Sequence, residues 1–138
     1  MTPQKLDISS FAKAIARLEE GLARYEQNTD DDQIRDGLIQ RFEFTYELSH
    51  KMLKRHLEMT SPTPDMYDTM AFQDLIRTGN EQGLLLGDWS AWRNYRGMRA
   101  KTSHTYDEEV ALEVAAVIPE FLREARFLRD KLIERGHE

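Results

Sequence analysis

Residues 32–59 read DQIRDGLIQRFEFTYELSHKMLKRHLEM, and the length of this stretch governs the architecture of the chain. Its apolar and small residues return every three or four positions, which is the spacing of one face of a helix. At about 1.5 Å of rise per residue, a helix over the whole stretch is a long rod. Its stripe consists of Ile34, Leu38, Phe42, Thr45, Ser49, Met52 and His56, with Ile39, Leu53 and Leu57 beside it.

The segments on both sides of this rod delimit it. A first helix precedes it, with Asp7 or Ser9 as the expected N-cap and one apolar face. Residues 28–32 interrupt the pattern, and their acids suit the start of the next helix. After the rod, Pro62 and Pro64 cannot continue a helix because each lacks the amide donor, so the rod ends near residue 59. The apolar face of the first helix consists of Phe11, Ile15, Leu18, Leu22 and Tyr25.

Two helices are predicted directly beyond the prolines. Residues 69–77 form a short amphipathic segment, which Gly79-Asn80 and Gly83 close off. Asp88 is the expected N-cap of a fourth helix. The aromatic residues of that helix match an apolar face better than a surface for stacking on nucleic-acid bases, so core packing is favoured for them. They are Trp89, Trp92 and Tyr95.

A fifth helix begins after Asp107, and Pro119 is expected to bend it rather than to end it. Its basic residues alternate with acids such as Glu124, which predicts a solvated face. No segment alternates like a strand, and none repeats. The sequence therefore predicts an all-α fold, an up-and-down four-helix bundle with one additional short helix, as a single domain over residues 1–138.

Composition excludes several classes of chemistry. The 138 residues include no cysteine, so disulfides, thiolate metal sites and cysteine nucleophiles are ruled out. A net charge of −6 argues against broad attachment to nucleic acid or to anionic membranes. The first thirty residues are too rich in charge for a signal peptide or a membrane span, so a cytoplasmic location is expected.

One segment departs from this acidic average, because residues 89–104 contain four basic residues and no acid. In an unbroken helix Arg99 and His104 point about 140° apart, so they can share a site only if the helix loosens near Thr102 and Ser103. With that turn, the guanidinium could hold a phosphate while the imidazole takes a proton from a 2′-hydroxyl, as metal-free RNA cleavage requires. The open alternative is structural: Arg99 pairs with an acid of the bundle, and His104 hydrogen-bonds to polar groups of a loop or helix end.

Several stretches together carry a family resemblance. They are RDGLIQRFEFTYEL at 35–48, GLL at 83–85 with Trp92 later, and TSHTYD at 102–107. The chain resembles the nucleotidyltransferase substrate-binding proteins, members of the HEPN superfamily similar to HepT toxins. The resemblance implies that Arg99, His104 and Tyr106 form a ribonuclease motif, with two copies brought together in a homodimer. It also implies a partner, a minimal nucleotidyltransferase that acts as antitoxin and adenylylates Tyr106.

Three further residues are expected to support this site. The resemblance implies that Arg41 and Glu43 lie at the dimer groove and orient Arg99 or His104, with Ser103 in the same groove. A competing interpretation is that Glu43, Glu47 and Lys51 form an exposed ion-pair ladder on the second helix. A metal site built on His50 and His56 is disfavoured because no third ligand follows at helical spacing, so neither a metal nor a cofactor is expected.

The residue after Arg99 keeps a second function open. Many HEPN ribonucleases have a polar residue there, often Asn, whereas this chain has Ala100. A non-catalytic adaptor that presents substrate to the nucleotidyltransferase is therefore the alternative to an endoribonuclease. A helical protein that only dimerises is a third possibility, and it leaves the polar cluster unexplained.

Overall fold

Helix α2 covers Asp32–Met59, the bounds that its apolar stripe predicts. The Asp31 carboxylate caps it by accepting the backbone N–H groups of Gln33 at 3.0 Å and Ile34 at 3.1 Å. The helix stops at Thr60, ahead of the proline segment, where the N–H of Thr60 bonds to the carbonyl of His56. All the other helices pack against this rod.

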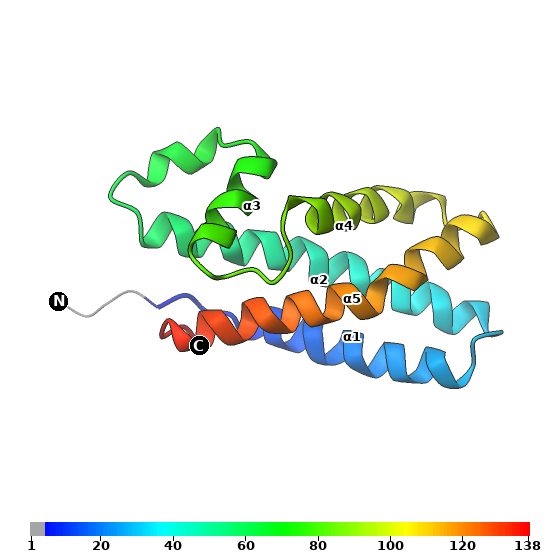
Figure 1. Cartoon of the computed structure of the whole chain (residues 1–138). Coiled ribbons are helices and arrows are strands. Elements are labelled where there is room, and N and C mark those ends of the chain that lie inside the picture. The colour runs from blue at the N-terminus through cyan, green and yellow to red at the C-terminus, as the bar shows by residue number, and fades with distance from the viewer. Residues whose placement is uncertain (1–4) are drawn as a thin grey trace.

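A computed structural model describes residues 5–138 and contains five α-helices and two short 3₁₀ segments in that range. The long helices are α1 (Ser9–Gln27), α2, α4 (Trp89–Lys101) and α5 (Glu108–Glu134). Figure 1 shows them running alternately up and down, with the short α3 (Phe72–Glu81) outside this bundle. The predicted all-α class with one additional short helix is confirmed, and residues 1–4 of the predicted domain lie outside the described range.

Helix α3 differs from its predicted bounds. Residues 64–68 form a 3₁₀ turn, and the helix then begins at Phe72 and continues through Gly79 to Glu81. Gly79 does not end the helix and serves packing instead: a Cβ there would lie 2.9 Å from Cδ1 of Leu85. The glycine thus marks a close approach of the following loop, a role that its position in the sequence does not reveal.

The start of α4 is held by a buried acid from α5. The carboxylate of Glu124 accepts the backbone N–H groups of Leu86 at 2.7 Å and Gly87 at 2.6 Å. Glu124 is 1% exposed, and its burial raises the pKa of the carboxyl. A Cβ on Gly87 would lie 2.8 Å from Oε1 of Glu124 and from Cβ of Ala91, so only glycine fits. The expectation that Glu124 belongs to a solvated face is wrong.

Aromatic rings from three helices make the centre of the core. Phe121 of α5 packs edge-on against Phe42 of α2 and Tyr95 of α4, with ring centroids 5.1 and 5.3 Å apart. Trp92 is fully buried and lies edge-on to Tyr95 at 5.5 Å. Core packing is therefore confirmed for Trp92 and Tyr95. This contact joins α4 to both α2 and α5, and it positions the end of α4, where the candidate site lies.

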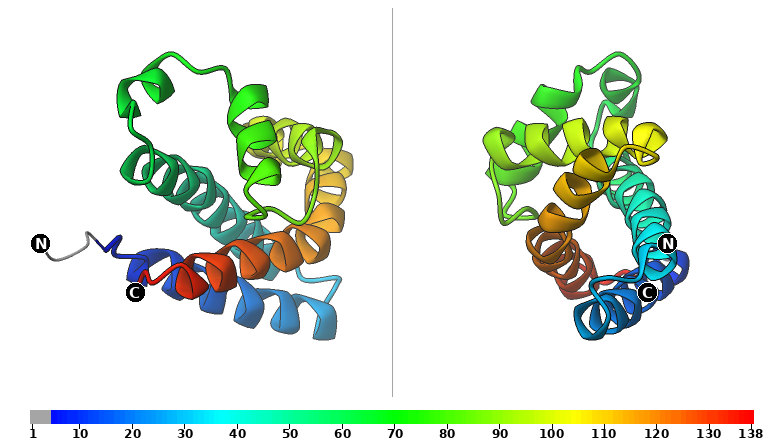
Figure 2. Two further views of the ribbon diagram at one scale, coloured as in Figure 1. Left: turned by 60° about the vertical axis from the view of Figure 1, so that its left-hand side comes forward. Right: turned by 90° about the vertical axis from the view of Figure 1, so that its right-hand side faces the viewer.

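The last helix continues through Pro119, as predicted, and Figure 2 shows it changing direction partway along. Beyond it, the chain returns to the N-terminal segment: the N–H of Ile8 bonds to the carbonyl of Glu138 at 3.0 Å, and the N–H of Glu138 to that of Leu6 at 3.2 Å. Figure 1 shows the two ends of the described chain at the same end of the bundle. Among residues 5–138, no helix is both long and apolar enough to cross a membrane.

Candidate functional site

Helix α4 ends where the spacing of Arg99 and His104 predicts a break. The α-helix stops at Lys101, and residues 102–104 form a single 3₁₀ turn. The hydroxyl of Thr102 donates to the carbonyl of Arg99 at 2.7 Å, which tightens this turn. Asp107 then caps α5 by accepting the N–H of Glu109 at 3.0 Å. The predicted helix end is confirmed, and it forms a tight polar corner between α4 and α5.

Arg99 is anchored by its neighbours but keeps donors to spare. Its Nε donates to Oε1 of Glu47 at 3.0 Å, and its Nη1 donates to the hydroxyl of Thr102 at 3.2 Å. Nη2 lies 3.9 Å from Oε2 of Glu43, which is too far for a hydrogen bond. Because a guanidinium carries five N–H donors, several remain for a ligand. The side chain is 34% exposed, so a ligand can reach it.

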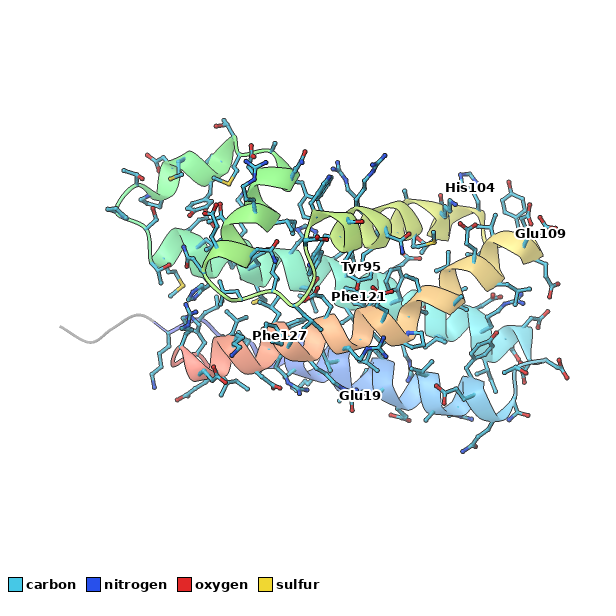
Figure 3. The ribbon with its side chains drawn as sticks, in the orientation of Figure 1. Glu19, Tyr95, His104, Glu109, Phe121 and Phe127 are labelled. Atoms are coloured by element: carbon cyan, nitrogen blue, oxygen red, sulfur yellow. The ribbon has the colours of Figure 1, made fainter. Side chains whose placement is uncertain are left out.

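His104 and Tyr106 lie at the outer edge of the corner. Their rings meet edge-on, with centroids 6.1 Å apart, and Tyr106 is 87% exposed. Figure 3 shows the His104 side chain at the junction of α4 and α5, pointing away from the bundle. Within residues 5–138 no hydrogen bond joins His104 to Arg99. In a single copy of the chain, His104 therefore packs against Tyr106 but is not hydrogen-bonded to Arg99.

The three expected supporting residues are in different places. Glu43 faces Arg99 across the α2–α4 contact, and Ser103 lies in the 3₁₀ turn, where its hydroxyl donates to the carbonyl of Ala100 at 3.4 Å. Arg41 instead faces α1, and its Nη1 donates to the carbonyl of Arg17 at 2.7 Å. The structure thus brings Glu43 and Ser103 to the polar corner but does not bring Arg41 there.

Glu47 is a site residue that the sequence pattern does not identify. The ion-pair ladder interpretation assigns it to Lys51, whereas its two oxygens bond to Nε of Arg99 at 3.0 Å and to Nε2 of His50 at 3.2 Å. The interpretation that Arg99 pairs with an acid of the bundle therefore holds in this structure. The signal that could have found it is the position of Glu47 one turn after Glu43 on the same face of α2.

A pocket of about 420 Å³ adjoins Arg99 between α2 and α4, with α3 at its edge. Three of its side chains are aromatic or imidazole rings, and two are guanidinium groups. Burial raises the pKa of the Tyr46 hydroxyl to about 12, so this group keeps its proton at neutral pH. The lining residues are Tyr46, Glu47, His50, Phe72, Arg96, Arg99 and Ala100.

The two histidines considered as metal ligands have other partners: His50 bonds to Glu47, and His56 bonds to His137. Nδ1 of His137 accepts the N–H of Leu6 at 3.0 Å, so its Nε2–H donates to Nδ1 of His56 at 2.7 Å. Burial lowers the pKa of His56 to about 4 and lowers that of His137, so both rings are neutral at physiological pH. In the described part of the chain, no three His, Asp or Glu side chains gather in a way that could hold a metal ion.

Comparison with known proteins places this arrangement in a family. The profile of the family described as nucleotidyltransferase substrate binding protein like matches residues 6–134. The chain is 39% identical over 144 residues to a Haemophilus influenzae protein named Probable ribonuclease HepT, covering 99% of this chain and 98% of that protein.

Two solved structures are similar in fold. One is a Haemophilus influenzae protein described as having the fold of a substrate binding domain of a nucleotidyltransferase, with a TM-score of 0.86, 37% identity and coverage of 91% of this chain and 98% of that one. The other, from Thermus thermophilus, has a TM-score of 0.68 and 28% identity, covering 88% of this chain and 98% of that one. As its sequence pattern predicts, the chain belongs to the nucleotidyltransferase substrate-binding protein family.

Proposed function

We propose that this protein is the HEPN component of a two-component nucleotidyltransferase system and acts as a HepT-like endoribonuclease. The observation that carries the proposal is the state of Arg99, which Glu47 and Thr102 hold in place while its remaining N–H groups stay available beside an exposed His104. A relative covering nearly the whole chain is named a probable ribonuclease, which supports this choice.

The reaction uses the two motif side chains in separate roles. His104 removes the proton of a ribose 2′-hydroxyl, whose oxygen then attacks the adjacent phosphorus. Arg99 donates paired hydrogen bonds to the phosphate oxygens as negative charge develops on them. The bond to the 5′-oxygen breaks, and that oxygen takes up a proton. The products are a 2′,3′-cyclic phosphate and a 5′-hydroxyl, and the scheme uses no metal ion or cofactor.

A homodimer completes the site in this proposal. Within residues 5–138 of one chain no hydrogen bond links Arg99 with His104, and solvent reaches both side chains, since Arg99 is 34% exposed and His104 is exposed. A two-fold axis beside this corner places the motif of one protomer opposite that of its partner and creates one composite site. The 87% exposure of Tyr106 leaves a large ring available at the same surface.

The partner in this proposal is a minimal nucleotidyltransferase that acts as the antitoxin. Its reaction joins the Tyr106 oxygen to the α-phosphate of ATP and releases pyrophosphate. The added nucleotide fills the space next to His104 and brings negative charge that repels RNA. Modified protein is therefore inactive, and free protein is active.

The test uses the protein free of its partner, with Tyr106 shown to be unmodified by mass spectrometry. Wild type, Arg99→Ala, His104→Ala and the control Arg93→Ala, an exposed arginine on the same helix, are incubated with a mixed-sequence RNA. We expect cleavage by wild type and Arg93→Ala, with cyclic-phosphate ends, and a loss of about 100-fold or more in the two motif variants. Intact RNA with all four proteins would rule the nuclease out.

An adaptor that presents substrate to the nucleotidyltransferase is the second candidate. Ala100 stands where many HEPN ribonucleases have a polar residue, and Glu47 already occupies one edge of Arg99. This candidate predicts that adding the protein raises the rate of nucleotidyl transfer onto a substrate other than itself. If adding this protein leaves the rate of nucleotidyl transfer unchanged and the wild type cleaves RNA, the adaptor function is excluded and the nuclease function is supported.

A further inference from the structure

The pocket between α2 and α4 (the α2–α4 pocket) lies directly beside Arg99. Arg99 lines it, together with Arg96 one turn earlier in α4. His104 lies beyond the end of the helix and does not line the pocket. A strand held at Arg99 by its phosphate therefore lies directly beside the α2–α4 pocket.

The charges of the pocket favour an anion. Glu47 is its one acidic side chain, and Arg99 and His50 already bind both oxygens of that carboxylate. Arg96 forms no ion pair with any residue that the structure describes. Its guanidinium instead lies 5.3 Å from the centroid of the Phe72 ring and is exposed. Against the chain's net charge of −6, the pocket thus offers a guanidinium that lacks a counter-charge.

The remaining walls are aromatic and suit a base. His50 lies between Tyr46 and Phe72, with ring centroids 5.3 and 5.8 Å away. The Tyr46 hydroxyl retains its proton and forms no hydrogen bond with a side chain or backbone group in residues 5–138. It can donate to a ligand. The volume of about 420 Å³ is within the range of small-ligand pockets.

We propose that the α2–α4 pocket binds the RNA nucleotide next to the scissile phosphate, with Arg96 on its phosphate and its base against Phe72 and His50. Proteins that read single-stranded RNA combine these two contacts, a cation on the backbone and a ring on the base. The assignment rests on the proposed RNA-cleaving function. It adds Arg96 and Phe72 to the residues that bind substrate. Neither belongs to the predicted motif of Arg99, His104 and Tyr106.

The test measures binding separately from cleavage. The probe is a fluorescein-labelled, mixed-sequence RNA of twelve nucleotides, fully 2′-O-methylated so that it has no 2′-hydroxyl to react. Its anisotropy gives Kd for wild type, Arg96→Ala and Arg93→Ala over a range of salt concentrations. We expect Arg96→Ala to weaken binding by about tenfold and to reduce the salt slope by about 0.7, the share of one phosphate contact on a single strand. Arg93→Ala, which removes the same charge outside the pocket, should weaken it by less than about twofold.

A second variant tests the base contact. Phe72→Leu retains an apolar side chain where Phe72 packs against Trp89 and Trp92, so the fold should persist. It should weaken binding of the same probe by about fivefold or more and leave binding of an abasic probe of equal charge unchanged. If Phe72→Leu weakens binding of the two probes equally, Phe72 does not contact the base, and that part of the proposal is wrong.

The outcomes for binding and for cleavage are distinguishable. If wild type fails to cleave unmodified RNA while Arg96→Ala still loses binding selectively, the nuclease proposal fails and the α2–α4 pocket stands. If Arg96→Ala and Arg93→Ala weaken binding of the probe equally, the pocket assignment is overturned whatever the cleavage result. Binding of ATP that depends on Arg96, without a matching effect on RNA, would overturn it as well.

Discussion

Nε of Arg99 donates to Oε1 of Glu47 at 3.0 Å, so a carboxylate on α2 already holds the guanidinium that is expected to bind phosphate. This pair couples the end of α4 to the middle of α2. It also makes Glu47 a competitor of any anion that approaches Arg99. The strength of that competition can be measured, because the pair is partly exposed and each partner can be changed without opening the core.

Glu47→Gln should strengthen RNA binding. The substitution retains an oxygen acceptor for Arg99 but removes a negative charge beside the phosphate site, and the removed repulsion is worth about 1 kcal/mol near a surface. We expect Kd for the 2′-O-methylated probe to fall about fivefold, with no change in Glu58→Gln, which removes an acid at the far end of α2. A weaker complex would mean that Glu47 orients Arg99 rather than competing with RNA.

Glu124→Gln should destabilise the fold. Both oxygens of this carboxylate accept backbone N–H groups, at 2.7 and 2.6 Å, and the amide nitrogen of glutamine would face one of these donors. An unsatisfied buried donor costs about 1–3 kcal/mol, which a urea titration would resolve. Glu134→Gln, an exposed acid of the same helix, is the control and should change stability by less than about 0.5 kcal/mol. Equal midpoints for the two variants would show that the loop does not depend on Glu124.

Stability should fall as the pH drops below about 6.5. The pKa of His56 is lowered by burial from 6.5 to about 4, so between these values the unfolded chain binds more protons than the folded one. The contribution of neutral His56 is complete above pH 6.5 and is lost progressively towards pH 4. We expect the free energy of unfolding to be about 2 kcal/mol lower at pH 5 than at pH 8.

The matched variant for this pH dependence is His56→Asn, which offers an acceptor to His137 but does not titrate. Its stability should be lower than that of wild type at pH 8, and the difference between pH 8 and pH 5 should shrink. If the two proteins lose the same free energy over this interval, the buried histidine is not the cause.

Tyr106→Phe should abolish modification by the partner nucleotidyltransferase and leave the fold unchanged. Tyr106 is 87% exposed, whereas Tyr46 and Tyr95 are 4% and 2% exposed, so it is the tyrosine of this group that an enzyme can reach. Intact-mass spectrometry after incubation with the partner and ATP should show added AMP on wild type and none on the variant. Added AMP on both would place the modification elsewhere.

The sequence predicts the long elements well, because their signals are local. Asp31, Asp88 and Asp107 each precede an apolar run, and each caps the helix that follows it. The bounds of α3 are less predictable. Gly79 has the pattern of a helix end, and nothing in the local sequence indicates that Leu85 packs against it. Local patterns therefore predict where helices form but not which glycines serve packing.

The position of the candidate site is more predictable than its contacts. The spacing of Arg99 and His104 requires a break in α4, and the break is there. The family resemblance places Arg41 in the same groove as Glu43, but two residues along a helix turn the side chain about 200°, which takes Arg41 to the α1 side. The pairing of Glu47 with Arg99 depends on how α2 and α4 pack, which no local pattern contains.

The contact of Glu124 with Gly87 also has an evolutionary consequence. The acid needs a neighbour without a side chain, and the loop needs the acid to satisfy two amides that lie 37 and 38 positions away in the chain. Neither residue can change alone without a clash or an orphaned donor. Among relatives these two positions should therefore co-vary: a chain that lacks the acid is free to replace the glycine, and a chain that keeps the acid retains it.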